Sequence, residues 1–556
     1  MRQRKRHNAT IARWLLLLVG LSLIAMTPAR HVRAAAVLTK RVDATGVTAS
    51  AWTSIKWLAP VAGPTTFTLS WTGGGDLRMD LRRASDLMWI ASATTAANPK
   101  SMTANVQAGV SYQIAVWAQS GVGDFTVTKA GAPQRPNILI VLTDDQRRES
   151  LPMMPSVKKW FGAQGQTFTQ GYVTTPSCCP SRAAILTGRY DHNNGVISQA
   201  GPAFDEGTSI ARYLKDAGYA TGHVGKYVHY YSLAERAPYW DRWTFWTGGY
   251  DNVYMNFDGE VRQSVGYSTR IAFDTAISYV NSWETRDSQP WMMLVAPTAP
   301  HLVGRTPPPA EAKYATAPVP AMVRNPSTLE ADRSDKPAFL YCCSVTEAGV
   351  ASEYTAMTRA SYTIDDGVNQ LMNRLAAAGE LDNTIAFFLS DNGIMLGDHG
   401  LDRKFVPYTA SVGVPFLVRW TGRIAPGTVD NRFMGNIDIA PTALAAAGVV
   451  PLVKMDGRDL LTTPPRTRRL TEYWQDNQNV ATIPAWASVA TTTYEYTEYY
   501  KPDTRTVQFR EYYDMVRDPH QLLNLFADGN AANDPNVTAI AAQLKADRTC
   551  VAASCP

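Results

Sequence analysis

The chain has 556 residues, of which 45% are hydrophobic and 18% are charged. This composition excludes extended disorder, and the length predicts two or three domains, because a single core stops growing well below this size. The net charge is +5, but residues 1–36 hold seven Lys or Arg and no acidic residue, which leaves −2 on the remainder. The charge therefore gives no support for nucleic-acid binding, and we expect no nucleic-acid partner.

The first 36 residues have the layout of a secretory signal. Basic residues lie in the first six positions, residues 14–26 form an apolar run, and 34–36 are three alanines that suit a cleavage site. The apolar run has 13 residues, whereas a membrane-spanning helix needs roughly 20. We predict a signal peptide at 1–36 and a secreted, periplasmic or extracellular protein without a stable membrane span. A retained membrane anchor is the alternative.

Residues 37–130 are predicted to form a β-sandwich accessory domain. Runs at 67–71, 77–81 and 112–116 alternate apolar with polar or small residues, and turns such as the glycines at 73–75 separate them. Such alternation is typical of antiparallel strands with one buried face. The segment contains five tryptophans, at Trp52, Trp57, Trp71, Trp89 and Trp117. We favour core packing for these side chains, and stacking on sugar rings is the alternative.

A linker at 131–136 leads into a region with a different pattern. Short apolar runs alternate with longer helical stretches, such as 209–217 and 354–378. The apolar runs predicted as strands are 137–142, 220–224, 291–295 and 384–389. This alternation favours an α/β domain at 137–464 with a mostly parallel sheet covered by helices.

The last part of the chain, 465–556, is predicted as a smaller α+β subdomain. Runs rich in Tyr and Thr at 488–500 and 506–513 suggest an antiparallel sheet, and 537–546 suggests a closing helix. The chain contains six cysteines. Cys550 and Cys555 are close enough to form a disulfide in an exported protein, whereas the pairing of the cysteines at 342–343 stays open. No Cys or His spacing suggests structural zinc.

Polar residues follow four of the predicted strands. Asp144 and Asp145 come after the first strand and Asp391 after the last, while the other two lead to Lys226 and His301. In open α/β sheets, ligands bind beyond the carboxyl ends of the strands. We therefore expect these residues to meet in one site.

The acidic members of this set are candidate metal ligands. Asp144, Asp145, Asp391 and Asn392 all offer hard oxygen donors, which Ca²⁺ and Mg²⁺ prefer. A single pair of this kind is usually a surface turn. Because two pairs each end a predicted buried strand, we expect a divalent cation here, Ca²⁺ first and Mg²⁺ as the alternative.

Residues 178–189 read C-C-P-S-R-A-A-I-L-T-G-R. This segment resembles the sulfatase signature C-x-P-S-R followed by L-T-G, whose seven specified residues match by chance about once per billion start positions at typical residue frequencies. The chain is identified as a member of the formylglycine-dependent sulfatases, and the resemblance extends over roughly 134–530. The C-C-P-S-R, G-K-Y and A-P-H motifs look closest to N-acetylglucosamine-6-sulfatase-like members. The resemblance implies an alkaline phosphatase-like α/β fold.

The resemblance implies that a formylglycine-generating enzyme oxidises Cys178 to 3-oxoalanine (formylglycine), whose hydrated aldehyde is the nucleophile. A serine would give a stable sulfate ester, whereas a geminal diol attacks with one hydroxyl and expels sulfate by collapsing the other to a carbonyl. Pro180 suits a first helical turn, so the nucleophile is expected at a helix N-terminus, where backbone N–H groups favour an anion.

By the same resemblance, Arg182 holds the formylglycine and a metal ligand in place. Lys226, in the family's G-K motif, and Lys404, four residues before Tyr408 in a K-x-x-x-Y segment, bind the sulfate oxygens. Asp391 assists deprotonation of the attacking hydroxyl.

Three histidines complete the implied site. His301, in an A-P-H motif, protonates the leaving alcohol, and His399, in an L-G-D-H-G motif, contacts the substrate. His229 assists release of sulfate, although it lies three residues after Lys226, where many relatives have a histidine two residues after. The implied catalytic set is Cys178, Arg182, Lys226, His229, His301 and Lys404. The implied metal ligands are Asp144, Asp145, Cys178, Asp391 and Asn392, and the substrate-binding residues are Lys226, His301, His399 and Lys404.

Two positions depart from the family's pattern. Thr409 stands where an acidic residue usually follows the tyrosine, and Gly413 stands where a basic residue usually precedes Val-Pro. Neither change removes a catalytic group, but both weaken inference about the substrate rim.

The sequence thus predicts a sulfuric ester hydrolase that acts on sulfate monoesters of a sulfated carbohydrate. A phosphonate monoester or phosphodiester hydrolase of the same superfamily is the nearest alternative. A zinc phosphatase is disfavoured, because such enzymes need several histidine ligands and only eight histidines occur, two of them in the leader. A secreted glycan-binding protein with an inactive catalytic domain is the alternative from another class.

Overall fold

The structure is a computed structural model. It describes residues 36–40, 52–59, 63–72, 76–107, 110–120, 125–130, 135–199, 204–228, 231–284, 289–341, 345–474, 483–502 and 506–556. His229, Cys342, Cys343, nearly all of the predicted signal peptide and residues 131–134 of the predicted linker lie outside these ranges.

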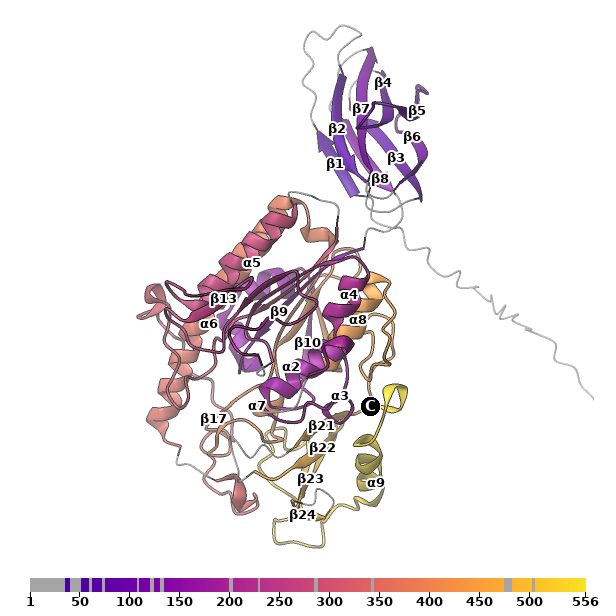
Figure 1. Ribbon diagram of the computed structural model, residues 1–556. Helices are drawn as coiled ribbons and strands as arrows, with labels where there is room; N and C mark the ends of the chain where they lie inside the picture. Colours follow the sequence, from indigo (N-terminus) through magenta and orange to yellow (C-terminus); the bar gives the residue numbers. More distant parts are fainter. Residues whose placement is uncertain are drawn as a thin grey trace, which may run out of the picture.

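The N-terminal segment forms two four-stranded antiparallel sheets (Figure 1). One has the order β1-β8-β3-β6 and the other β2-β7-β4-β5. Their bounds are β1 Ala36–Lys40, β2 Trp52–Leu58, β3 Gly63–Trp71, β4 Asp76–Arg83, β5 Trp89–Ala93, β6 Lys100–Val106, β7 Ser111–Ser120 and β8 Phe125–Ala130. Alternate residues of both sheets, among them Phe67, Met79 and Ile114, are fully buried in one shared core. The predicted β-sandwich is confirmed, because one apolar face per sheet is what the alternation requires.

The tryptophans of this segment divide between core and surface. Trp71 is buried, and the ring of Trp57 packs edge-on against Phe67 at 5.3 Å. Trp89, in contrast, is 51% exposed, and Trp117 is only partly buried. The prediction of core packing is therefore confirmed for Trp57 and Trp71 and wrong for Trp89, while the side chain of Trp52 lies outside the described residues.

A ten-stranded sheet forms the centre of the second region (Figure 1). Its order is β14-β13-β12-β11-β15-β9-β16-β19-β10-β20. The bounds are β9 Asn137–Thr143, β10 Gln166–Tyr172, β11 Ala220–Gly225, β12 Arg242–Phe245, β13 Tyr254–Phe257, β14 Glu260–Gln263, β15 Trp291–Ala296, β16 Thr384–Ser390, β19 Phe416–Arg419 and β20 Thr428–Gly435. Five neighbouring strands of this sheet, β12, β11, β15, β9 and β16, are parallel to one another. The pairs at the two ends of this group, β12 with β13 and β16 with β19, are antiparallel. The predicted mostly parallel sheet is confirmed.

Helices cover both faces of this sheet. On one face lie α2 Cys178–Thr187, α4 Ile210–Asp216 and α8 Ile439–Ala447, and on the other α5 Ser268–Glu284 and α6 Glu347–Ala378 (Figure 1). Ile140 packs on the side covered by α2, α4 and α8, and its neighbours Leu139 and Val141 pack on the side covered by α5 and α6. Because both faces are covered, the central strands are continuous apolar runs, which is why their positions could be predicted. Shorter elements are α1 Pro155–Val157, α3 Asp191–Asn194, α7 Thr409–Val412, β17 Met395–Leu396 and β18 Asp402–Arg403.

The C-terminal part is an antiparallel sheet followed by a helix, as predicted. Strands β21 Arg469–Tyr473, β22 Trp486–Ala490, β23 Tyr494–Tyr500 and β24 Val507–Asp514 pair in sequence order, and α9 is Thr538–Asp547. None of the helices within the described residues is long and apolar enough to cross a bilayer.

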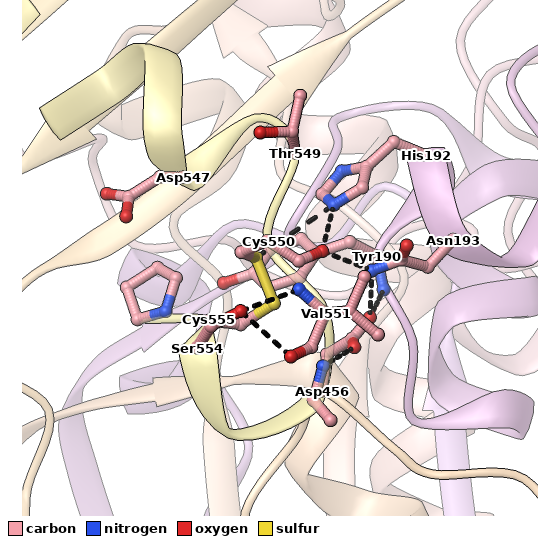
Figure 2. The surroundings of a disulfide bond; sticks show 12 residues. Tyr190, His192, Asn193, Asp456, Asp547, Thr549, Cys550, Val551, Ser554 and Cys555 are labelled. Carbon is pink, nitrogen blue, oxygen red and sulfur yellow. Dashed lines mark hydrogen bonds between the residues drawn. A yellow bond between two sulfur atoms is a disulfide. The ribbon is translucent and has the colours of Figure 1, made fainter. Parts of the chain in front are cut away.

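The last residues of the chain are anchored to the second region (Figure 2). Cys550 and Cys555 form the predicted disulfide. The Cys550 carbonyl accepts hydrogen bonds from Asn193 Nδ2 at 2.8 Å and from His192 Nε2 at 3.0 Å. Asp456 accepts the Ala552 N–H at 2.6 Å. The disulfide thus closes a short loop that α3 holds by side-chain hydrogen bonds.

Candidate active site

The register of the large sheet brings the four predicted strand ends together. Ser390 of β16 pairs with Thr143 of β9, so the following residues, Asp391 and Asp144, start from adjacent positions. The Asp391 N–H donates to the Thr143 carbonyl at 3.0 Å. At the neighbouring strands, the Lys226 N–H donates to the Ala296 carbonyl at 2.8 Å. Residues far apart in sequence therefore share one edge of the sheet, as expected from its parallel order.

Gly225, just before Lys226, is required by this close approach. Its φ is +117°, and a Cβ at this position would lie 2.0 Å from the Ala296 carbonyl oxygen. Any side chain would push β11 away from β15 at the site. The glycine of the G-K motif thus lets the lysine reach the carboxylates.

Three buried carboxylates face three buried cations. Lys226 Nζ lies 2.5 Å from Asp144 Oδ2, and Arg182 Nε lies 2.8 Å from Asp391 Oδ2. The third pair is Lys404 Nζ with Asp145 Oδ1. Buried charges are tolerated when they are paired and hydrogen-bonded, and here the numbers of each sign are equal.

Arg182 links several parts of this cluster. Besides its bond to Asp391, Arg182 Nη1 donates to the Lys226 carbonyl at 2.6 Å. Its Nη2 is buried, makes no hydrogen bond and lies 3.5 Å from Asp144 Oδ2. The guanidinium therefore fixes the backbone of Lys226 and still has one N–H pair without a hydrogen-bond acceptor.

Burial and charge act oppositely on the ionisation of this cluster. Burial raises the pKa of Asp144, but the charges of Lys226, His301, Arg182 and Lys404 outweigh it and hold that pKa well below its usual value. Burial lowers the pKa of Lys226, but the negative groups around it, Asp144 first and then Cys178 and Asp391, together outweigh burial and raise that pKa above its ordinary value. Burial and the neighbouring Asp144 raise the pKa of Asp391. Asp144 and Lys226 thus stabilise each other in their charged forms.

Cys178 is the first residue of α2, and its side chain lies among these groups, as predicted. Its Sγ lies 2.8 Å from Lys404 Nζ and 3.5 Å from Asp144 Oδ1. Burial raises the pKa of the thiol, and the charges of Asp144 and Asp391 raise it further. Cys178 is only 2% exposed, so its side chain lies at a helix N-terminus inside a water-poor cluster of charges.

Gln199 is a contact of this helix start that the sequence did not reveal. Its Oε1 accepts the Cys179 N–H at 3.3 Å, and its Nε2 donates to Ser177 Oγ at 3.1 Å. The side chain therefore braces the residues on either side of Cys178. No motif in the sequence marked this glutamine.

The oxygen donors fit a hard divalent cation. Ligand atoms of Asp144, Asp145, Cys178 and His301 lie within 4.8 Å of one another. Lys404 Nζ donates to Asp145 Oδ1 and, at 3.3 Å, to Asn392 Oδ1, so a positive charge already lies where these oxygens converge. Carboxylate and amide oxygens are the ligands that Ca²⁺ and Mg²⁺ prefer.

Asn392 and Asp391 are held in this arrangement by their own hydrogen bonds. Asn392 Nδ2 donates to Asp145 Oδ1 at 2.5 Å and to the Gly393 carbonyl at 2.9 Å. Asp391 Oδ1 accepts the Asp145 N–H at 3.2 Å. Of the five predicted metal ligands, Asp144, Asp145 and Cys178 belong to the group within 4.8 Å, and Asp391 and Asn392 are joined to it by hydrogen bonds with Asp145.

His301 lies at the accessible side of the cluster. Its side chain is 30% exposed, and its Nε2 is 3.5 Å from Asp145 Oδ2. Its Nδ1 contacts the Leu302 carbonyl, an acceptor, so Nδ1 carries a proton and Nε2 is the nitrogen that faces the site. A partly exposed imidazole in contact with the carboxylates suits proton transfer.

His399 lies apart from the cluster of charges. The residue is buried, its Nδ1 lies 2.7 Å from Glu330 Oε2, and its ring centroid is 4.3 Å from that of Tyr408. These contacts orient the segment that carries Lys404. Substrate contact through the other ring nitrogen stays a prediction.

A second support for the same segment is an ion pair that the sequence did not reveal. Arg147 pairs with the buried carboxylate of Asp398, and Arg147 Nη1 donates to the Ile394 carbonyl at 3.1 Å. Asn325 Nδ2 also donates to Asp398, at 3.2 Å. The only signal was the position of Arg147 two residues after Asp145.

The two departures from the family's pattern have structural counterparts. The Thr409 N–H donates to Gln521 Oε1 at 2.9 Å, so its backbone is held from the C-terminal subdomain. A Cβ at Gly413 would lie 3.6 Å from the guanidinium of Arg148. A basic group therefore lies beside position 413 although it comes from another part of the chain.

Comparison with known families agrees with this geometry. A family model described as Sulfatase matches residues 136–449, and one described as N-sulphoglucosamine sulphohydrolase, C-terminal, matches residues 397–549. The chain is 33% identical over 370 residues to the extracellular sulfatase SULF-1 homolog of Drosophila melanogaster, covering 62% of this chain and 33% of that protein. It is 30% identical over 367 residues to the N-acetylglucosamine-6-sulfatase of Homo sapiens, covering 60% of this chain and 65% of that protein. The chain thus spans less than two thirds of the length of these relatives.

Solved structures share the fold at low sequence identity. A structure in complex with its substrate D-glucosamine-2-N,6-O-disulfate superposes with a TM-score of 0.61 at 22% identity, covering 74% of this chain and 96% of the other. The phosphonate monoester hydrolase of Agrobacterium radiobacter gives 0.57 at 19% identity, with the same two coverages. These likenesses show the fold alone. The family model covers more than half of the sequence, and it includes the strand ends and the helix that build the site. The chain belongs to the sulfatase family.

Proposed function

We propose that this protein hydrolyses sulfate monoesters of a sulfated sugar, with Cys178 converted to formylglycine as the nucleophile. The observation that carries this function is the position of Cys178 at the start of α2, in contact with Lys404 and next to Asp144. The trigonal-bipyramidal transition state of attack on sulfur carries negative charge on its oxygens and needs converging cations, and Lys226, Lys404 and Arg182 supply them.

The substrate class is supported by the relatives. Two of them are named N-acetylglucosamine-6-sulfatase and extracellular sulfatase, and a structural neighbour holds D-glucosamine-2-N,6-O-disulfate as its substrate. Sulfated sugars therefore come first among the candidate substrates. Secretion is proposed with it, from the leader at 1–36.

Asp144, Asp145, Asp391 and Asn392 would hold the divalent cation, Ca²⁺ first and Mg²⁺ as the alternative, beside residue 178. When bound, the cation supplies positive charge that polarises the sulfate ester and favours the ionised nucleophile. The formylglycine, made by a formylglycine-generating enzyme, supplies a geminal diol with one hydroxyl for attack and one for release of the product.

The other residues of the site bind, orient and transfer protons. Lys226 and Lys404 hold sulfate oxygens, and Arg182 keeps Asp391 and the Lys226 backbone in position. Asp391, whose pKa burial and Asp144 raise, accepts the proton of the attacking hydroxyl. His301 donates a proton from Nε2 to the leaving alcohol.

The remaining roles belong to the rim and the product step. His399 contacts the substrate, and His229, outside the described residues, assists sulfate release. The chain is divided as its composition suggests, into a signal at 1–36, an accessory sandwich at 37–130, a linker at 131–136, a catalytic domain at 137–464 and a C-terminal subdomain at 465–556.

The test compares two esters on the same preparation. We expect kcat/KM for 4-nitrophenyl sulfate to exceed that for 4-nitrophenyl phenylphosphonate by at least about a hundredfold, since the three cations of the site must fit one anion geometry. A strong preference for the phosphonate would instead establish the second candidate, a phosphonate monoester hydrolase, which the fold of a structural neighbour favours. No release from either ester, in protein carrying the aldehyde, would favour a glycan-binding protein without catalysis.

A further inference from the structure

The outer face of the sheet β2-β7-β4-β5 carries aromatic and basic side chains in register. Arg82 of β4 is opposite Trp89 of β5, and Arg78 of β4 is opposite Trp117 of β7. Facing residues on neighbouring strands share one side of a sheet. Met79, which lies between them with opposite parity, is fully buried in the sandwich core. The two arginines and two tryptophans therefore share the side that faces away from the core.

The four side chains form one packed cluster. Arg82 Cζ lies 5.3 Å from the Trp89 ring centroid and 5.1 Å from that of Trp117. Arg78 Cζ lies 5.6 Å and 5.7 Å from the same two rings. Both guanidiniums thus lie within cation–π distance of both indoles, which orients the charges and keeps the rings apart. We call these four residues the Trp–Arg face.

Asp80 anchors the Trp–Arg face from below. It lies on the same side of β4 between the two arginines, is 0% exposed, and its carboxylate is 3.6 Å from Arg78 Nε and from Arg82 Nη2. A fully buried carboxylate beneath two partly exposed guanidiniums is a costly arrangement for a surface whose only role is solubility. Its charge attracts both guanidiniums, although neither of its oxygens makes a hydrogen bond.

The face retains binding capacity that the fold does not use. Trp89 is 51% exposed, and the side chains of Arg78 and Arg82 are 27% and 17% exposed, so an indole ring and parts of two guanidinium-bearing side chains reach the surface. Polar side chains normally cover the outer face of a sandwich sheet, so exposed indole rings there mark a contact surface.

The charge of the face selects its occupant. Lys56 of β2 is exposed and stands opposite Gln113 of β7, which in turn stands opposite Arg82. Among the described residues, the three cations Lys56, Arg78 and Arg82 share this side with the carboxylate of Asp80, while Asp76, of the same parity on β4, is paired with Lys100. Indole faces stack on flat apolar surfaces, and guanidinium forks bind oxyanions such as sulfate groups in a bidentate way.

We infer that the Trp–Arg face is a second glycan-binding site, separate from the catalytic cluster, which binds a sulfated polysaccharide. The indole of Trp89 stacks on a sugar ring, and Arg78, Arg82 and Lys56 bind sulfate groups along the polymer. This binding needs neither the formylglycine nor the metal, so it holds or fails independently of the proposed catalysis.

Affinity electrophoresis of the full-length protein in gels containing dextran sulfate tests the site. A Cys178→Ala background prevents turnover. We expect Trp89→Ala to raise the apparent Kd for dextran sulfate by about tenfold, and the double variant Arg78→Gln/Arg82→Gln to do the same. Neutral dextran should not retard any variant. Arg83→Gln is the matched control, because Arg83 follows Arg82 on β4 and pairs with Asp86 instead.

Two further measurements keep the outcome interpretable. Arg82→Lys retains the charge without the planar fork and should keep part of the binding even if the glutamine variant folds poorly. In the Cys178 form, Trp89→Ala should leave sulfate release from 4-nitrophenyl sulfate unchanged. The inference is overturned if Trp89→Ala and the double variant bind dextran sulfate like the parent, or if Arg83→Gln weakens binding equally. Equal retardation by neutral dextran would also overturn the inference. So would a dimer that Trp89→Ala converts to a monomer while polymer binding stays unchanged.

Discussion

Two buried carboxylate centres of this protein are stabilised in different ways. In the proposed catalytic cluster, Asp144, Asp145 and Asp391 face two lysines and an arginine. In the C-terminal sheet, Glu511 accepts hydrogen bonds from three neutral tyrosine hydroxyls (Tyr408, Tyr499 and Tyr513, at 2.7, 2.7 and 2.9 Å). Both centres are almost fully excluded from water.

The difference separates the proposed reactive site from a structural centre. Burial raises the pKa of Glu511, and the three hydroxyls only partly offset this. The oxygens of Glu511 are occupied, and Lys336, whose charge also lowers the pKa of Glu511, is itself paired with Asp335. The catalytic cluster keeps charges of both signs, which can be redistributed when an anion and a metal ion enter. The segment from Lys404 to Tyr408 connects the two centres, because Lys404 contacts Cys178 and Tyr408 donates to Glu511. Substituting Lys404 therefore tests the first centre, and substituting Tyr408 tests the second.

The largest effect is expected for Asp391→Asn. This change removes a predicted metal ligand and the partner of Arg182 Nε, so kcat/KM for a sulfate ester should fall by about 10³-fold or more. Added Ca²⁺ should raise the melting temperature of the parent but not of the variant. A ligand that binds only the folded protein stabilises the folded protein against unfolding. Glu511→Gln is the control and should keep the Ca²⁺ response. An unchanged Ca²⁺ response in Asp391→Asn would contradict the ligand assignment.

Lys404→Ala should have the next largest effect on turnover. The ammonium lies 2.8 Å from Cys178 Sγ, so its loss removes a cation from the position where sulfate charge develops. We expect kcat to fall by about 10²–10³-fold, the size typical of losing one such donor. Tyr408→Phe, at the other end of the segment, should keep kcat within about threefold. Steady-state kinetics on one aryl sulfate measure the kcat of both variants. Equal losses of kcat in the two variants would refute the assignment of Lys404 to the reactive centre and of Tyr408 to the structural one.

Glu511→Gln should act on stability and hardly on chemistry. An amide has one acceptor oxygen, so hydroxyls that now donate to two carboxylate oxygens lose partners inside the protein. The free energy of unfolding should drop by about 2–3 kcal/mol in urea titrations. The kcat of the folded variant should stay within about threefold of the parent. A hundredfold loss of kcat at unchanged stability would place Glu511 in the reactive site instead.

The smallest expected effect concerns a third carboxylate, Glu206 of η3 (Glu206–Thr208). Its oxygens accept the hydroxyls of Tyr227 at 2.8 Å and Tyr231 at 2.5 Å. Burial raises its pKa to about 7. The stability that this group contributes is therefore complete below its unfolded pKa near 4.5 and is lost as the pH rises through 7.

Glu206→Gln removes this dependence. Between pH 6 and pH 8 the parent should lose about 1 kcal/mol more unfolding free energy than the variant, from the linkage of the two pKa values. Urea titrations at the two pH values measure the difference. Identical slopes in parent and variant would show that the hydroxyl-bound carboxylate is ionised throughout.

Much of the fold and the site could be predicted because the decisive signals are local. A strand buried on both faces is a continuous apolar run, and Asp144 and Asp391 follow such runs directly. The helix beginning at Cys178 carries its own motif. Partners that are distant in sequence could not be found in this way: Asp398 lies 251 residues from Arg147, and Glu330 lies 69 residues from His399.

The surface tryptophans illustrate the same limit. The pairing of β4 with β5 skips one residue of β5: Leu81 is opposite Ala91, but Arg82 is opposite Trp89. This shift places the Trp89 side chain on the outer face of the sheet and not in the core. Alternation within one strand cannot reveal a bulge in the pairing of two strands, because an added residue changes the face on which side chains lie. Core packing was therefore the natural expectation, and it was wrong for Trp89.

The central claim is tested most directly by mass spectrometry of the tryptic peptide 160–182 from active protein. Conversion of Cys178 to the aldehyde needed for the diol nucleophile lowers the mass by about 18 Da. Cys179, one residue later, is an internal control that should still react with a thiol reagent. We predict the lighter peptide with one alkylated cysteine, in a fraction that rises with sulfate release. A fully active preparation in which both cysteines are alkylated would contradict the account.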